Sequence, residues 1–366
     1  MKRKVGYFEP LLGGLAAMLL AIGGPSTLAQ SPPAPAKPAD STTADPPVAV
    51  VPTAAAVPRV NRLDVQIPEQ PPGYSSRAEV IARIGLGTIK LIDLKNDPLP
   101  AGVQEIKAVE YGRGGDKQLL LDLHLPAAST GPRPGLIFIH GGAWSGGERE
   151  VYHYYTKRLA QQGYVAATIS YRLSGVAPFP AAVHDCKCAV RWMRAMADKY
   201  QIDPQRISVL GGSAGGHLAM MVGYCDDPEL EGDGGHAGIS SRVSSVVNFY
   251  GPSDLTTEAA RTADPVRKFL GGSFDQRTTL YEQASPVRHV DANDPPTLII
   301  HGTLDELVAI EQSDRLAERL HQQGVPFAYD RLTGWPHTLD VAVPVNEHCL
   351  ELMKSFLATV NRVEPR

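Results

Sequence analysis

Ser213 lies among glycines and alanine in the stretch SVLGGSAGGHLAM, positions 208–220. Ser213 has two glycines before it, and an alanine and two more glycines after it. An apolar run precedes this stretch and a helix-like pattern follows it. Glycines suit a sharp strand-to-helix corner because they carry no side chain that would collide with either element. The pattern is typical of a nucleophile elbow, with an ordinary glycine-rich turn as the alternative, and it makes Ser213 the candidate nucleophile.

A serine of this kind needs an acidic residue and then a histidine later in the chain. Asp305 lies in HGTLDELV, directly after an apolar run, and is the candidate acid. Its neighbour Glu306 is the weaker choice. Asp254, in YGPSDL, also follows an apolar run, but an aspartate at such a place more often caps a helix.

The candidate base is His337, which lies in TGWPHTLD after the last predicted strand. Asp305 would hold one tautomer of the imidazole, while the other ring nitrogen takes the proton of Ser213. Three further histidines compete for this role. They are His301, within the strand and loop of the acid, and His321 and His348, within predicted helices.

The segment FIHGGAW at 138–144 follows another apolar run and predicts the groups that stabilise an oxyanion. The N–H groups of Gly141 and Gly142, together with that of Ala214 directly after the serine, would point at the developing negative charge. We expect His140 to shape this loop by hydrogen bonding. Trp144 either lines the substrate pocket or packs in the core.

These residues need elements that bring them together. Two alternating segments, EIKAVEYG and QLLLDLHLP, flank RGGD and predict an antiparallel hairpin. Apolar strands then alternate with helices to the end of the chain. The predicted strands are 135–140, 165–172, 206–210, 243–251, 297–302 and 327–332. We therefore expect a mostly parallel sheet with helices on both faces, an antiparallel N-terminal edge and the site at the carboxyl ends of the strands.

The chain divides into four predicted regions. Residues 1–29 combine a basic start, a short apolar run and small residues before Gln30, which predicts a signal peptide cleaved near Ala29 and a secreted or periplasmic protein. An uncleaved membrane anchor is the alternative. Residues 30–75 are rich in Pro and Ala and predict a disordered linker. Residues 76–104 are undecided, and 105–366 form the catalytic domain.

Composition narrows the possible partners. The net charge of −4 and the lack of a basic stripe give no indication of nucleic-acid binding. Four cysteines, Cys186, Cys188, Cys225 and Cys349, are either buried thiols or include one disulfide, and no histidine cluster accompanies them at metal spacing. We expect no cofactor or metal and no membrane span after signal cleavage, and oligomeric state stays open.

The acidic, glycine-rich segment 226–242 is either a solvated loop or a lid.

In combination, HGGAW, GGSAGGHLA, YGPSDL, HGTLDELV and PHT resemble the α/β-hydrolases of the hormone-sensitive-lipase-like esterases. The chain looks most similar to the secreted bacterial acetyl xylan and feruloyl esterases within that group. This resemblance implies an α/β-hydrolase fold and cleavage of short acyl esters, with a carbohydrate ester or another small ester as substrate. The alternatives are an amide-cleaving enzyme with the same residues, such as a peptidase or aryl formamidase, and an inactive hydrolase fold used for binding.

Overall fold

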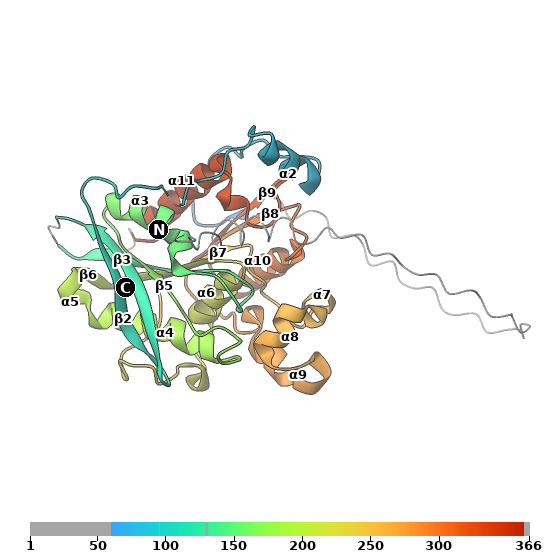
Figure 1. Ribbon diagram of the computed structural model, residues 1–366. Coiled ribbons are helices and arrows are strands. Elements are labelled where there is room, and N and C mark those ends of the chain that lie inside the picture. The colour runs from blue at the N-terminus through green and yellow to red at the C-terminus, as the bar shows by residue number, and fades with distance from the viewer. Residues whose placement is uncertain (1–59, 95, 129–130, 362–366) are drawn as a thin grey trace, which may run out of the picture. The chain divides into compact units, whose positions relative to one another are not determined.

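The protein is described by a computed structural model that covers residues 60–94, 96–128 and 131–361. Its centre is a sheet of nine strands in the order β1-β9-β8-β7-β6-β4-β5-β3-β2 (Figure 1). The predicted hairpin is confirmed: β2 (Val103–Gly114) and β3 (Lys117–Pro126) pair antiparallel at one edge, and β3 pairs antiparallel with β5.

The six central strands run parallel, as the alternation of strands and helices predicts. They are β4 (Arg133–Ile139), β5 (Val165–Ile169), β6 (Ile202–Gly212), β7 (Ser245–Phe249), β8 (Thr297–Gly302) and β9 (Phe327–Leu332). Both faces of these strands are buried, which explains their continuous apolar sequences. In β4, for example, Ile137 and Ile139 pack into one core cluster while Leu136 and Phe138 pack into the other.

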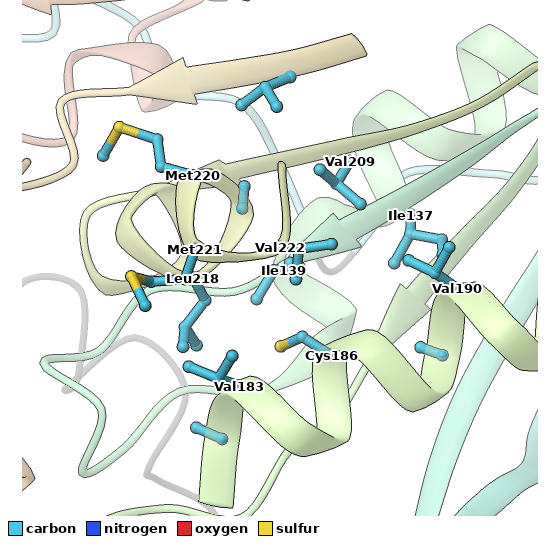
Figure 2. Close-up of a cluster of buried hydrophobic side chains, with 14 of the residues drawn as sticks. Ile137, Ile139, Val183, Cys186, Val190, Val209, Leu218, Met220, Met221 and Val222 are labelled. Carbon is cyan, nitrogen blue, oxygen red and sulfur yellow. The ribbon is translucent and has the colours of Figure 1, made fainter. Parts of the chain in front are cut away.

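Helices cover both faces of the sheet, as expected. One face carries α4 (Ala181–Ala195), α6 (Ala214–Tyr224) and α10 (Glu311–Gln323); the other carries α2 (Arg77–Gly85), α3 (His153–Gln161) and α11 (Val343–Val360) (Figure 1). Figure 2 shows part of the core cluster that contains Ile137 and Ile139. Val183 and Cys186 of α4 and Leu218 of α6 pack there beside Ile139 of the sheet. This packing fixes α6, and therefore the corner at its start.

Shorter helices complete the domain. They are α5 (Ala197–Tyr200), α7 (Glu258–Thr262), α8 (Asp264–Leu270) and α9 (Phe274–Gln283), with 3-10 turns at Arg149–Tyr152, Pro228–Leu230, Pro286–Arg288 and Leu339–Val341. Among the described residues, no helix combines the length and the apolar character needed to cross a membrane.

The predicted end of the linker at residue 75 is wrong. Strand β1 (Val60–Asn61) adds to the second edge of the sheet by pairing antiparallel with β9, and Val65 is buried. The sequence pattern misleads here because this segment has no core of its own and is held by hydrogen bonds to distant residues. The predicted signal peptide and the rest of the linker, residues 30–59, lie outside the described residues.

The structure bears on two alternatives that the sequence leaves open. All four cysteines are buried and free. The segment 226–242 packs against α4: the carboxylate of Glu231 pairs with Lys187 at 2.5 Å and with Arg191 at 3.1 Å, and the ring of His184 bonds the carbonyl of Glu229 at 3.1 Å. No hydrogen bond of the described residues joins this segment to Ser213, so the contacts favour a loop anchored to α4 over a lid.

Candidate active site

Ser213 lies at the corner between β6 and α6 with a strained backbone, φ 57° and ψ −123°. Its N–H donates to the carbonyl of Phe249 on the neighbouring strand at 2.9 Å. A side chain on Gly211 would overlap the carbonyl of Gly215, and one on Gly215 would overlap the carbonyl of Ile139. The two glycines of Gly-x-Ser-x-Gly are therefore required by close backbone contacts, as the elbow interpretation expects.

The other two glycines of the stretch face side chains. A Cβ on Gly212 would overlap the hydroxyl of Tyr152, and one on Gly216 would overlap the amide oxygen of Asn248. At all four positions around the serine, a side chain would therefore overlap a neighbouring group of the sheet or of an adjoining loop.

The structure brings the three predicted side chains together. His337 Nε2 lies 2.9 Å from Ser213 Oγ, and His337 Nδ1 lies 2.6 Å from Asp305 Oδ2. The exposed fractions of His337 and Asp305 are only 8% and 9%. These are the distances of a serine–histidine–aspartate hydrogen-bond chain, in which one ring nitrogen faces the hydroxyl and the other faces the carboxylate.

The Asp305 carboxylate is surrounded by donors. Its Oδ1 accepts from the N–H groups of Leu307 at 2.9 Å and Val308 at 2.8 Å, and its Oδ2 faces both His337 and His301. Burial alone would raise the pKa of Asp305, but the hydrogen bonds from the two histidines outweigh it and hold that pKa well below its usual range. Asp305 is therefore a carboxylate at neutral pH.

His301 is a supporting residue that the sequence reasoning considered only as a rival base. Its Nε2 lies 3.1 Å from Asp305 Oδ2 and 2.9 Å from the carbonyl of Val308, and its Nδ1 lies 2.7 Å from Ser313 Oγ. It is fully buried, and its hydrogen bonds among the described residues reach Asp305, Val308 and Ser313 rather than the serine hydroxyl. The sequence feature that could have indicated this role is the spacing of four residues between His301 and Asp305 at the end of a strand, which allows the two side chains to meet.

The remaining rivals have other partners. Glu306 is largely exposed and pairs with Arg77 at 3.5 Å, and Asp254 accepts from the N–H and hydroxyl of Thr256 instead of capping a helix. His321 contacts Arg62, and His348 pairs with Asp330 at 2.6 Å. None of these hydrogen bonds reaches Ser213.

The predicted oxyanion donors lie around the serine. A Cβ on Gly141 would come within 2.9 Å of the Gly212 carbonyl and 3.3 Å of Ser213 Cβ, so this backbone touches the elbow directly. Gly142 has φ +109°, which favours glycine, and Ala214 begins α6. Among the described residues, the N–H groups of these three residues donate to no protein acceptor. A helix N-terminus and free N–H groups beside the nucleophile suit a negatively charged oxygen.

Trp144 is held inside the fold. Its exposed fraction is 4%, its ring stacks on Phe269 with centroids 4.6 Å apart, and its Nε1–H donates to His217 Nδ1 at 3.2 Å. These contacts favour the packing alternative over substrate binding. They also fix the oxyanion loop to α6 and α8.

His140 shapes the loop, as expected. Its Nδ1 lies 2.7 Å from the Gly141 carbonyl and its ring stacks on Tyr171 at 4.4 Å. Burial lowers the pKa of His140 to about 4, so the ring is neutral and Nδ1–H donates to the carbonyl.

A buried tyrosine–aspartate pair, Tyr250 and Asp340, lies next to His337, and no motif in the sequence indicates it. The Tyr250 ring meets the His337 ring edge to face, with centroids 4.7 Å apart, and the Tyr250 hydroxyl donates to the Asp340 carboxylate. This pair supports one side of the imidazole.

One cluster has the residue types of a metal site. Ligand atoms of Glu105, His124 and His153 lie within 4.8 Å of one another, at β2, β3 and α3. They are already engaged: His124 Nε2 lies 3.0 Å from Glu105, and His153 Nε2 lies 3.1 Å from Asp122. No hydrogen bond of the described residues links this cluster to Ser213.

The sheet order, the elbow and the Ser213–His337–Asp305 chain define an α/β-hydrolase. A family model described as BD-FAE matches residues 121–320, more than half of the chain, and the chain belongs to this family. The match includes Ser213 and Asp305 and ends before His337.

Known proteins agree with this assignment. Esterase LipC of Mycobacterium tuberculosis is 36% identical over 237 residues, covering 62% of this chain and 59% of LipC. The chain spans 59–64% of the length of the three mycobacterial relatives that it matches. Two solved structures are also similar. A truncated carbohydrate esterase from gut microbiota has a TM-score of 0.61 and 26% identity over 69% of this chain and 96% of its own. Apo Thermogutta terrifontis esterase 2 has a TM-score of 0.63 and 27% identity over 74% of this chain and 99% of its own.

Proposed function

We propose that the protein is a serine carboxylic ester hydrolase that works through an acyl-enzyme. The observation that carries this proposal is the unbroken hydrogen-bond chain from Ser213 through His337 to Asp305, beside the backbone N–H groups of Gly141, Gly142 and Ala214. Similarity to esterases, including LipC and T. terrifontis esterase 2, supports the same reaction class.

Each step has an assigned residue. Ser213 Oγ attacks the ester carbonyl carbon while His337 Nε2 takes its proton, and the Asp305 carboxylate stabilises the imidazolium. The N–H groups of Gly141, Gly142 and Ala214 donate to the oxyanion of the tetrahedral intermediate. His337 then returns the proton to the departing alcohol. Water, deprotonated by His337, attacks the acyl-enzyme and releases the acid and Ser213.

For the substrate, we propose a short acyl ester, with a carbohydrate ester as the first candidate. One structural neighbour is a carbohydrate esterase, and T. terrifontis esterase 2 has also been solved with butyrate bound. We further propose export of the protein, on the sequence of residues 1–29 alone. N-terminal sequencing of the mature protein tests this point, and an intact Met1 would contradict it.

The test of the reaction compares the wild type with Ser213→Ala and with Ser240→Ala, an exposed serine on the loop after α6. The substrates are p-nitrophenyl acetate, butyrate and octanoate, acetylated xylan and methyl ferulate. We expect the wild type and Ser240→Ala to hydrolyse the short esters and Ser213→Ala to lose about 10⁶ in kcat. Equal rates in all three proteins would remove Ser213 from the mechanism. Inactivity of the wild type on every ester would favour an amide-cleaving or binding role instead.

A further inference from the structure

The base is carried by the loop between β9 and α11, residues 333–342, and a distant part of the chain lies against this loop. We call residues 60–92 the N-terminal brace. The brace lies before the family match, which begins at residue 121. It begins at β1, which pairs with Tyr329 and Ala328 of β9, the strand that leads into the base loop.

The brace and the base loop first meet backbone to backbone. The Tyr74 N–H donates to the Gly334 carbonyl at 3.1 Å. A Cβ on Gly73 would overlap the carbonyl of Thr333, and a Cβ on Gly334 would overlap the N–H of Tyr74. Gly334 also has φ +75°, which favours glycine. A glycine on each side therefore permits an approach that no other residue type would allow.

Two side chains of the brace strengthen this contact. The Gln70 amide donates to Asp330 Oδ1 at 2.8 Å and to the Arg331 carbonyl at 2.7 Å. The Tyr74 ring meets Trp335 edge to face, with centroids 5.3 Å apart. Trp335 is buried, and its carbonyl accepts from the N–H of Leu304 at 2.9 Å, one residue before the acid. Trp335 thus joins the brace to both the base and the acid loop.

The brace meets the chain again on the far side of His337. Leu91 forms an antiparallel bridge with Ala342, the Ile92 N–H donates to the Val341 carbonyl at 2.9 Å, and the Val343 N–H donates to the Lys90 carbonyl at 2.9 Å. The base loop is therefore held on both sides of the histidine, near residue 334 and near residue 342. The nearby Arg77–Glu306 pair is largely exposed on the Glu306 side and contributes little to this attachment.

We propose that the N-terminal brace is a positioning element of the active site: it holds the base loop so that His337 Nε2 stays within hydrogen-bond distance of Ser213 Oγ. The proposal rests on the proposed esterase function, because it concerns the base of that reaction. A displacement of about 1 Å at a reacting group can cost about a hundredfold in rate, so a remote contact of this kind affects turnover directly.

The experiment uses the full chain and a matched pair of substitutions within the brace. Gly73→Ala places a methyl group against the Thr333 carbonyl. Gly85→Ala, at the end of α2, meets nothing within 4 Å. For both we would measure kcat and KM on p-nitrophenyl acetate per active site, counted with a fluorophosphonate. We would also record the melting temperature and the downfield proton resonance of the His337–Asp305 hydrogen bond.

We expect Gly73→Ala to lose about a hundredfold in kcat per active site, with KM little changed and the His337 resonance shifted or broadened. Gly85→Ala should match the wild type in kcat, KM and the His337 resonance, with an equal or slightly higher melting temperature because alanine favours the helix. Wild-type kcat per site in Gly73→Ala would overturn the proposal, because a purely structural contact would lower the folded fraction and not the turnover of folded molecules.

A milder pair covers the case in which Gly73→Ala does not fold. Gln70→Ala removes the amide that bonds Asp330 and Arg331, whereas Gln66→Ala changes an exposed side chain of the same segment. We expect about a tenfold loss of kcat in Gln70→Ala only, because the end of β9 that leads into the base loop is then held less closely and His337 is displaced by less than in Gly73→Ala. Equal kcat in these two variants would also overturn the proposal. A wild type without esterase activity would instead overturn the proposed function, and the His337 resonance would then report on the brace independently.

Discussion

The nucleophile and the base of this site are positioned in different ways. Ser213 is held by a corner whose glycines are its immediate neighbours and whose close contacts lie on the adjacent strands β4 and β7 and on the side chains of Tyr152 and Tyr250. His337 lies on a loop that is held by residues more than 240 positions earlier in the chain. The nucleophile and acid fall inside the family match at 121–320, and the base loop and the brace fall outside it. A local sequence motif can therefore specify the serine, whereas the place of the histidine depends on the whole fold.

The largest effect on this comparison is expected at Asp305. Its carboxylate bonds His337, and the N–H of Leu304 in its loop donates to the Trp335 carbonyl of the base loop. Asp305→Asn should lower kcat by about 10⁴, since the amide can no longer fix the correct tautomer of His337. Glu306→Gln changes the adjacent, exposed carboxylate and should leave kcat unchanged. The measurement is kcat on p-nitrophenyl acetate at neutral pH. If the two variants lost activity equally, Glu306 would have to be reconsidered as the acid.

Breaking the elbow itself should have the next largest effect. In Gly215→Ala the new methyl group would overlap the Ile139 carbonyl at the end of β4, just before the oxyanion loop. We expect a loss of about 1–3 kcal/mol in the free energy of unfolding and about a hundredfold in kcat, because β4 or α6 has to shift. Urea unfolding and kcat are the measurements. Wild-type values for both would show that the corner is looser than its contacts indicate.

A smaller effect is expected at His301, which bonds the same Asp305 oxygen as His337 does. His301→Leu removes a hydrogen bond to a carboxylate and should cost about tenfold in kcat. His301→Gln retains an amide donor and should recover part of that loss. Equal losses in the two variants would assign His301 to packing and not to the hydrogen bond. The pH dependence of kcat/KM should shift in the leucine variant only.

The sequence was sufficient for the local parts of the molecule. The alternation of apolar strands and helices predicted the parallel sheet, and the glycines around Ser213 predicted the corner. The sequence also indicated Asp305 and His337 as candidates, because each follows a strand and parallel strands end at one edge of the sheet. The contacts that hold the loop of His337 could not be predicted in this way.

The parts that sequence reasoning missed depend on contacts between distant residues. Val60–Asn61 is too short to be recognised as a strand, and the need for glycine at position 73 comes from the distant carbonyl of Thr333. The Tyr250–Asp340 pair behind the base joins residues 90 positions apart. Nothing in the composition of 60–75 distinguishes a bound segment from a free linker, since the bonds that hold it are made mostly by its backbone and by Gln70.

The pH dependence of stability tests the nucleophile side of the site without touching the reacting groups. His217, one turn after Ser213, is fully buried: its Nδ1 accepts from Trp144 Nε1–H, and its Nε2–H donates to the Ala284 carbonyl at 2.8 Å. Burial lowers the pKa of His217 to about 4, against an ordinary value of 6.5. Above pH 6.5 both the folded and the unfolded chain carry the neutral ring, and the full stability is present. As the pH falls from 6.5 towards 4, the unfolded chain binds a proton that the folded chain refuses, so stability declines.

His140 shifts in the same direction, so the two rings together should make the free energy of unfolding fall between pH 6.5 and 4, by up to about 1.4 kcal/mol per pH unit for each ring. Asp294, whose pKa burial raises to about 7, acts in the opposite direction and reduces the net slope.

Trp144→Phe tests the part that His217 plays in this pH dependence. It removes the donor that bonds His217 Nδ1, which should raise the pKa of His217 and make the free energy of unfolding depend less steeply on pH. Trp192→Phe, at another buried tryptophan, should leave the slope unchanged. Urea unfolding across this pH range measures both variants, and identical slopes would show that burial alone, and not the Trp144 bond, keeps His217 neutral.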